Sequence, residues 1–100
     1  MVVLPAERAE STISRLVGRE AAKCGCVKAV MVDRREDALD VLFVVDGDLF
    51  AGERAVLPLM RRLREELPDT AFDVMVMPSS RLSQGFRWGR APRTLFERSS

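Results

Sequence analysis

The sequence predicts one small α+β domain in which two helices cover one face of a mostly antiparallel, three-stranded sheet. Three observations lead to this prediction: the chain has 100 residues, an unbroken apolar run lies between Asp40 and Asp46, and two segments of helical periodicity flank the strands. One hundred residues can bury one modest core. Because the run does not alternate with polar residues, we expect a central strand covered on both faces. The predicted order is helix, strand, strand, helix, strand. The core domain spans residues 1–84, and a C-terminal segment, residues 85–100, packs on it or extends from it.

The first helix is expected over about residues 6–23, because apolar residues recur there at three- and four-residue steps. A strand over residues 26–32 should follow. The polar residues 33–37 then form a loop that is too short for a parallel crossover. The central strand, residues 39–46, should therefore return antiparallel and form a hairpin.

A second amphipathic helix is expected before residue 68. Its apolar stripe consists of Val56, Leu59, Met60, Leu63 and Leu67. An interior proline costs about 3 kcal/mol, so Pro58 predicts a helix that begins only near Arg54 or Ala55. Leu49 and Phe50 would then form a short hydrophobic plug ahead of it.

The last third of the chain predicts shorter elements. Residues 71–77 alternate as a strand, and a single helical turn is expected from Ser79 or Ser80 through Gln84. Gly85, Gly89 and Pro92 interrupt the segment that follows, and residues 94–96 could form a short edge strand.

Composition excludes several classes of function. The chain has no histidine, which excludes hydrolases built on a serine or cysteine with a histidine partner. The net charge of +1 provides no global field toward nucleic acid or membrane. No segment has the pattern of a signal peptide or the length of a bilayer span, so we expect a cytoplasmic protein with no membrane partner.

The two cysteines, Cys24 and Cys26, are separated by one glycine. They are too few for a disulfide framework, and with no histidine they cannot complete a set of four zinc ligands. Half a metal site and a redox pair remain alternatives. The favoured interpretation is two buried thiols that behave as small hydrophobic groups.

Three apolar strings also suggest a family. The segments 27–32, 39–44 and 72–76 resemble successive strands of the minimal nucleotidyltransferases of the DNA polymerase β superfamily, and residues 94–97 are similar to the closing strand of many members. The resemblance covers about residues 6–97 in the order of elements. It implies magnesium-dependent nucleotidyl transfer, with Asp40 and Asp73 as metal ligands. It also implies a helical protein partner, as in toxin–antitoxin pairs.

The departures from this family fall on its catalytic parts. Where the family has a Gly-Ser motif that opens a helix, this chain reads Val-Asp-Arg-Arg at residues 32–35. The family needs two aspartates spaced by one residue, and Ala38 stands where the first would pair with Asp40. Asp37 is one position out of register, which on a strand turns its side chain to the opposite face. The resemblance therefore implies a degenerate member without catalytic activity.

An acidic cluster is the first candidate site. Its members are Asp33, Glu36, Asp37, Asp40 and Asp73. Carboxylates gathered at one end of a sheet suit magnesium, which could align a triphosphate. The alternative is a solvated hairpin loop, with Asp40 and Asp73 paired to arginines.

The C-terminal segment is the second candidate site, and it is basic and aromatic. The predicted partner-binding residues are Phe86, Arg87, Trp88, Arg90 and Arg93. Tryptophan and arginine are frequent anchors of protein interfaces, and aromatics between arginines also suit stacking on nucleic-acid bases. In the opposing interpretation the aromatics fold back over the core and the arginines are merely exposed.

The leading hypothesis is a non-catalytic binding protein with a degenerate nucleotidyltransferase-like fold, which acts through a protein partner or as a homodimer and needs no cofactor. One alternative is an active nucleotidyltransferase that uses magnesium. Another is a small RNA- or ribosome-associated factor, because the order of elements also resembles KH-type ribosome-binding factors. That alternative lacks a Gly-x-x-Gly loop and a basic body.

Overall fold

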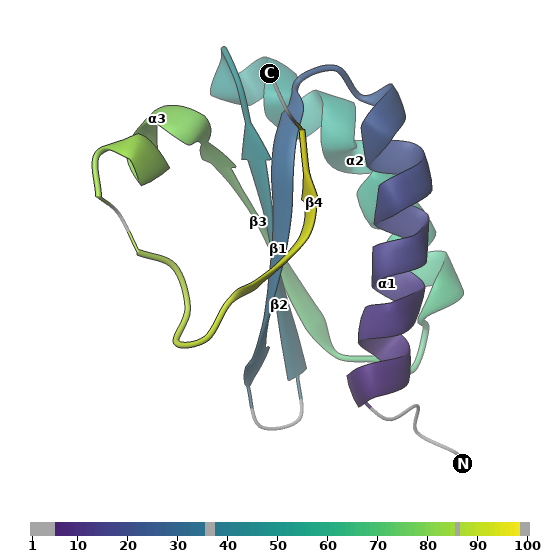
Figure 1. Ribbon diagram of the computed structural model, residues 1–100. Helices are drawn as coiled ribbons and strands as arrows, with labels where there is room; N and C mark the ends of the chain where they lie inside the picture. Colours follow the sequence, from purple (N-terminus) through teal and green to yellow (C-terminus); the bar gives the residue numbers. More distant parts are fainter. Residues whose placement is uncertain (1–5, 36–37, 86, 99–100) are drawn as a thin grey trace.

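The computed structural model describes residues 6–35, 38–85 and 87–98 of the chain (Figure 1). In chain order its elements are α1 (Ala6–Glu20), the 3-10 helix η1 (Ala21–Lys23), β1 (Val27–Arg35), β2 (Ala38–Val45), α2 (Leu49–Glu66), β3 (Phe72–Pro78), α3 (Ser79–Ser83) and β4 (Arg93–Glu97). The predicted α+β class is confirmed, and so is the predicted order of helix, strand, strand, helix and strand, with η1 continuing the first helix.

The sheet has four described strands in the order β3-β2-β1-β4 and is mixed. β1 pairs antiparallel with β2 and with β4, whereas β2 and β3 run parallel. The predicted sheet has one strand too few, whereas its mostly antiparallel character agrees with two of the three strand pairs. β2 and β3 run parallel because α2 is long enough for a crossover, which returns the chain to the same end of the sheet. The predicted edge strand near residues 94–96 is confirmed as β4.

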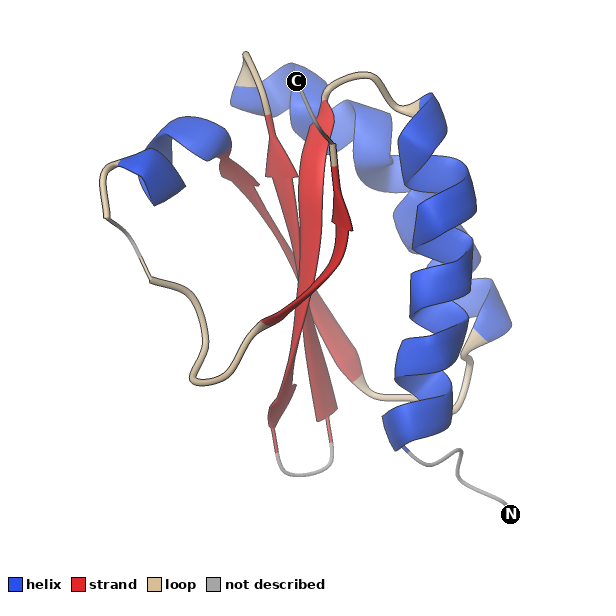
Figure 2. Cartoon of the chain, in the orientation of Figure 1, coloured by secondary structure: helices blue, strands red, loops and turns tan. Residues whose placement is uncertain are grey.

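The central position of β2 is confirmed, because both of its faces are covered. Figure 2 shows α1 and α2 on one side of the sheet and α3 on the other. The main core lies on the α1–α2 side and includes Phe43, which is completely buried. On the α3 side a smaller cluster of Leu42, Val44 and Met77 packs against Leu82 and Trp88. Side chains of β2 alternate between these two apolar layers, which explains the unbroken apolar run.

The β1–β2 hairpin is confirmed, but β1 extends three residues into the predicted loop and ends at Arg35. All three of these polar residues have partners in the fold, and Arg35 pairs with Asp40 and Asp73. Asp33 accepts a backbone hydrogen bond from Arg90, and Arg34 pairs with Glu10 of α1. Polar residues in a loop-like pattern therefore continue the strand, because their side chains are satisfied by distant segments. Residues 36 and 37 lie outside the described residues.

α2 begins at Leu49, earlier than predicted, because Asp48 caps it. A carboxylate oxygen of Asp48 accepts a hydrogen bond from the backbone N–H of Ala51 at 3.1 Å. Pro58 lies inside the helix on its exposed side, where water can hydrate the carbonyl that loses its donor. The predicted start near Arg54 or Ala55 was therefore wrong. So was the predicted plug, since Phe50 lies in the first turn of α2 with 77% of its surface exposed.

Gly52 sets the closest approach of α2 to the sheet. A Cβ atom at this position would lie 2.6 Å from a methyl group of Val45 in β2. The absent side chain therefore lets the helix backbone rest on the end of the strand.

Arg98 connects the segment after β4 to the end of the first helix. Its guanidinium donates hydrogen bonds to the carbonyl oxygens of Ala21, Ala22, Cys24 and Val27. Carbonyls at a helix C-terminus lack partners within the helix and favour a positive charge. This arginine of the basic C-terminal segment is consequently part of the fold rather than of a free surface.

Candidate functional site

Three aspartates stand opposite one another across three neighbouring strands. Asp33 of β1 is in register with Asp40 of β2, and Asp40 is in register with Asp73 of β3. Val32, which precedes Asp33, and Val41, which follows Asp40, belong to the main core. Because side chains alternate along a strand, the aspartates lie on the other face, the α3 side of the sheet. The structure therefore gathers the three described members of the predicted acidic cluster in one row.

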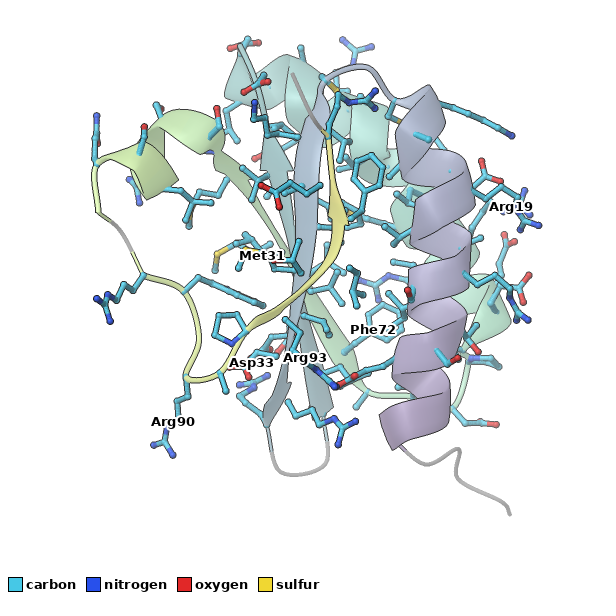
Figure 3. The ribbon with its side chains drawn as sticks, viewed as in Figure 1. Arg19, Met31, Asp33, Phe72, Arg90 and Arg93 are labelled. Atoms are coloured by element: carbon cyan, nitrogen blue, oxygen red, sulfur yellow. The ribbon has the colours of Figure 1, made fainter. Side chains whose placement is uncertain are left out.

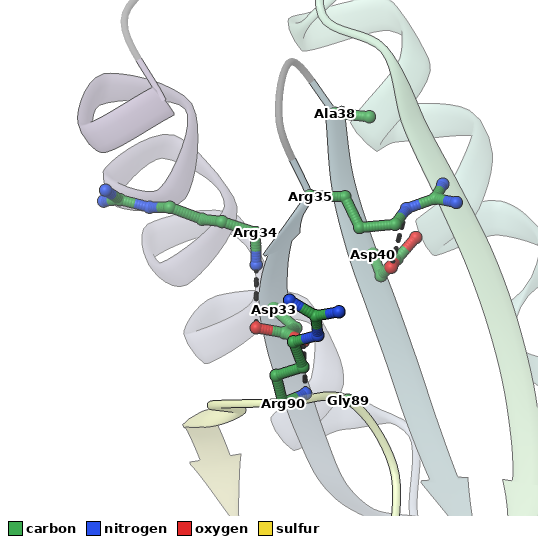
Figure 4. Close-up of a pocket in the computed structure, with 7 residues that line it drawn as sticks. All are labelled: Asp33, Arg34, Arg35, Ala38, Asp40, Gly89 and Arg90. Carbon is green, nitrogen blue, oxygen red and sulfur yellow. Dashed lines mark hydrogen bonds and ion pairs between the residues drawn. The ribbon is translucent and has the colours of Figure 1, made fainter.

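Arg35 lies between two of these aspartates. Its Nε lies 3.0 Å from Oδ2 of Asp40 (Figure 4). Its guanidinium also pairs with Asp73. The side chain of Asp40 is 25% exposed, whereas those of Arg35 and Asp73 are 56% and 76% exposed. Both predicted metal ligands are thus engaged by one guanidinium. Among the described residues, no group of three or more acidic or cysteine side chains is arranged to hold a metal ion.

Asp33 has a different role, because it is buried and holds a loop. Only 8% of the residue is exposed. Its two carboxylate oxygens accept hydrogen bonds from the backbone N–H groups of Arg34, at 3.0 Å, and Arg90, at 2.9 Å. Gly89 adopts a φ of +74°, and a Cβ atom there would lie 2.5 Å from Oδ2 of Asp33. The carboxylate thereby fixes the path of the loop that follows α3.

This contact predicts that Gly89→Ala destabilises the protein more than Gly85→Ala does. Both glycines have positive φ, but the space at Gly85 is open. We expect a loss of about 1 kcal/mol for Gly85→Ala from backbone strain alone, and roughly 2–3 kcal/mol for Gly89→Ala because the Asp33 contact is also displaced. Urea denaturation of both variants measures the difference. Equal losses would show that Asp33 does not hold the loop.

Two pockets flank Arg35 on this face. The larger, of about 710 Å³, lies between the β1–β2 hairpin and the loop at Gly89 and Arg90. The smaller, of about 480 Å³, is lined by Asp73 and Met75 of β3 and by Trp88. Arg35 and Asp40 line both pockets, so their ion pair separates them. The arrangement offers a concave surface of mixed charge with one aromatic side chain at its rim.

The predicted partner-binding residues do not all lie on the same face of the molecule. Arg87 and Arg90 are exposed, and Figure 3 shows the side chain of Arg90 pointing away from the body. Trp88 is half-buried against the smaller apolar cluster. Arg93 lies on the other face, where it pairs with Glu10 of α1, so the structure does not bring it together with the others. Phe86 lies outside the described residues.

The sequence prediction missed Glu10, a buried carboxylate that pairs with two arginines. It is 7% exposed, and its carboxylate pairs with Arg34, at 2.6 Å between Oε1 and Nε, and with Arg93. Its spacing from Ile13 and Val17 places it on the buried stripe of α1, and that position was the available signal. A charged residue on a buried stripe indicates a partner elsewhere in the chain. Here the partners tie α1 to β1 and β4.

Cys24 and Cys26 lie just before the start of β1. Both are free thiols and pack against the main core. Burial, the neighbouring Cys26 and Glu20 together raise the pKa of the Cys24 thiol above its ordinary value. This shift favours the thiol over the thiolate at neutral pH, which opposes thiolate chemistry at Cys24.

No family model, curated protein or solved structure matches the chain. The resemblance to nucleotidyltransferases stays a prediction from the sequence. Within the described part of the chain, no helix has both the length and the apolar character that crossing a bilayer requires.

Proposed function

We propose that this chain is a non-catalytic protein-binding module with a degenerate nucleotidyltransferase-like sheet, and that it binds its partner on the α3 side of that sheet. One observation carries the proposal: Arg35 pairs with both Asp40 and Asp73. A magnesium ion demands near-octahedral oxygen ligands at about 2.1 Å. Arg35 would have to leave both carboxylates before such a cation could reach them, and its charge would oppose the cation while it stayed nearby.

A preformed loop supports a binding role. Asp33 holds the backbone at Arg90, while Trp88 packs on the smaller apolar cluster. Because these contacts fix the loop before a partner arrives, little ordering entropy remains to oppose association. Arg87 and Arg90 stay exposed and carry positive charge, and Arg90 lines the larger pocket. A segment with acidic side chains suits this surface, since guanidinium groups bind carboxylates through paired hydrogen bonds.

A random peptide library displayed on phage and selected on the purified chain tests the proposal. We expect enriched peptides to carry Asp or Glu and to shift the fluorescence of Trp88, which is the only tryptophan. The variant Arg87→Glu/Arg90→Glu should bind these peptides about tenfold more weakly or worse. The matched control Arg15→Glu/Arg62→Glu has the same change in net charge at exposed helix positions and should bind normally. Equal loss in both variants, or no enrichment, would contradict the proposed surface.

Active nucleotidyl transfer is the second candidate, and one observation favours it. Asp40 and Asp73 are in register on neighbouring strands and on the same face, as two ligands of one metal would be. We expect incubation with labelled nucleoside triphosphates, magnesium and protein or RNA acceptors to give no labelled product. Labelling that Asp40→Asn abolishes would replace the binding proposal with the enzymatic one.

A further inference from the structure

α2 carries an exposed strip of alternating apolar and charged residues along one flank. The strip consists of Phe50, Glu53, Leu57, Arg61 and Arg64, at helical spacings of three and four. Phe50 is 77% exposed and Leu57 is 46% exposed, so both apolar side chains are accessible to a partner. Two of the three charged members of the strip, Glu53 and Arg61, make no ion pair with another described residue and are therefore available to a partner.

This flank faces the open edge of the sheet. The guanidinium of Arg64 lies over the ring of Phe72, the first residue of β3, at 5.6 Å from its centroid. On the opposite flank of α2, the carbonyl of Ala55 contacts the Cys24 thiol, close to β1. β3 is an edge strand, and no other described strand pairs with its outer side. Its side chains are apolar except for Asp73, and Met75 at its middle is 49% exposed.

We infer that this surface, β3 together with the exposed strip of α2, binds a second copy of the chain across a two-fold axis. The strip is self-complementary about Leu57. In an antiparallel pair of α2 helices centred there, Leu57 of the two copies would meet. Glu53 of each copy would face Arg61 of the other, and Phe50 would face Arg64. These contacts comprise one apolar pair, two ion pairs and two cation–π pairs. Because of the two-fold axis, the Glu53–Arg61 and Phe50–Arg64 contacts each occur twice, and Leu57 meets its own symmetry copy.

The same axis also serves β3. Gly52 rests on Val45, which is in register with Pro78 at one end of β3. Arg64 rests on Phe72 at the other end. Leu57, near the middle of this span, is therefore level with Met75. An axis through Met75 would pair the two β3 strands antiparallel and would join the two sheets into one continuous sheet.

The spacing of packed elements agrees with this arrangement. Neighbouring strands lie about 4.8 Å apart, whereas packed helices lie about 8–10 Å apart. α2 contacts both β2 and β3, so it lies over these two strands rather than beyond the edge. Two such helices would therefore meet at packing distance when their β3 strands pair. Pairing would also cover an apolar edge that otherwise exposes unpaired backbone groups. This inference concerns the outer edge of β3 and the flank of α2, whereas the proposed partner site lies on the α3 side of the sheet. Asp73 and Met75 border both surfaces, but the inference does not depend on the proposed partner site.

Charge reversal with rescue tests the inference by analytical ultracentrifugation. We expect the wild-type chain to be a dimer at about 100 μM. Glu53→Arg alone and Arg61→Glu alone each place like charges together twice, and each should weaken the dimer about tenfold or more. The double variant Glu53→Arg/Arg61→Glu restores opposite charges across the axis and should recover the dimer. Arg62→Glu, exposed elsewhere on α2, is the control and should leave association unchanged.

Recovery of the dimer in the double variant distinguishes a second copy of the chain from a different binding partner. Only in self-association does the double substitution change both sides of the interface. A wild-type chain that stays monomeric at this concentration would overturn the inference. The inference would also be overturned if the single charge reversals left the dimer unchanged, or if the double variant stayed monomeric. Leu57→Asp provides a further check, since this exposed position lies on the axis and the substitution should dissociate the dimer without unfolding the chain. A dimer that persists in Leu57→Asp would equally exclude this interface.

Discussion

The substitution Val44→Asp is expected to lower the free energy of unfolding by about 4–5 kcal/mol. Val44 is 1% exposed and lies in the central strand, within the smaller apolar cluster beside Leu42 and Met77. A carboxylate at this position would be buried among apolar side chains, none of which could pair with its charge. Because a domain of this size is stable by only about 5–15 kcal/mol, the variant should be close to unfolding at room temperature.

Urea denaturation followed by circular dichroism measures this effect. The matched control is Thr94→Asp, which introduces the same charge at an exposed position of β4, in register with Met31. That control should change stability by no more than about 0.5 kcal/mol. If Val44→Asp unfolded at the same urea concentration as Thr94→Asp, the α3 side of β2 would not be a packed layer.

The second large effect is expected when Glu10 loses both of its partners. The double variant Arg34→Ala/Arg93→Ala leaves the Glu10 carboxylate buried without a cation, and such a loss costs about 3–5 kcal/mol. The opposite change is milder. Glu10→Gln leaves two guanidinium groups whose side chains are 43% and 56% exposed, so both can turn toward water.

A third variant separates the charge from the packing. Adding Glu10→Gln to Arg34→Ala/Arg93→Ala removes the unpaired charge and retains the shape of the side chain. We expect this triple variant to regain at least half of the lost stability, as measured by thermal and urea unfolding. If the triple variant were as unstable as the double variant, the arginine side chains would contribute through packing and not through the ion pairs.

The central strand and the helices were predictable because their signals are local. An apolar run such as residues 41–45 and a stripe of period 3.6 reflect burial directly. The start of α2 was not predicted because Pro58 is a strong local signal against a helix, whereas the cap at Asp48 is a weak one. The mixed sheet was missed for another reason. Strand order depends on which segments pair at long range, and the sequence pattern of β3 is the same for parallel and antiparallel partners.

In the candidate site, too, some residues were predictable from the sequence and others were not. Asp40 and Asp73 could be picked out because they interrupt or flank apolar strands. Arg35, which pairs with both, lies in a polar stretch that predicts a loop, and nothing in its neighbours indicates the length of the hairpin. The pairing of Arg93 with Glu10 likewise joins opposite ends of the chain. Ion pairs between distant segments leave little periodic trace in a sequence, so the structure is needed to separate binding arginines from structural ones.

The contacts of Arg98 also bear on how the chain assembles as it is synthesised. This residue bonds to a carbonyl oxygen 77 positions earlier in the chain. β4, which precedes it, supplies the hydrogen-bonding partner for one side of β1. At ribosomal rates of about 5–20 residues per second, α1 and the β1–β2 hairpin would wait several seconds for that partner. During this interval the apolar edge of β1 is open to pairing with other nascent chains, so the newborn protein is most prone to aggregate just before its last strand arrives.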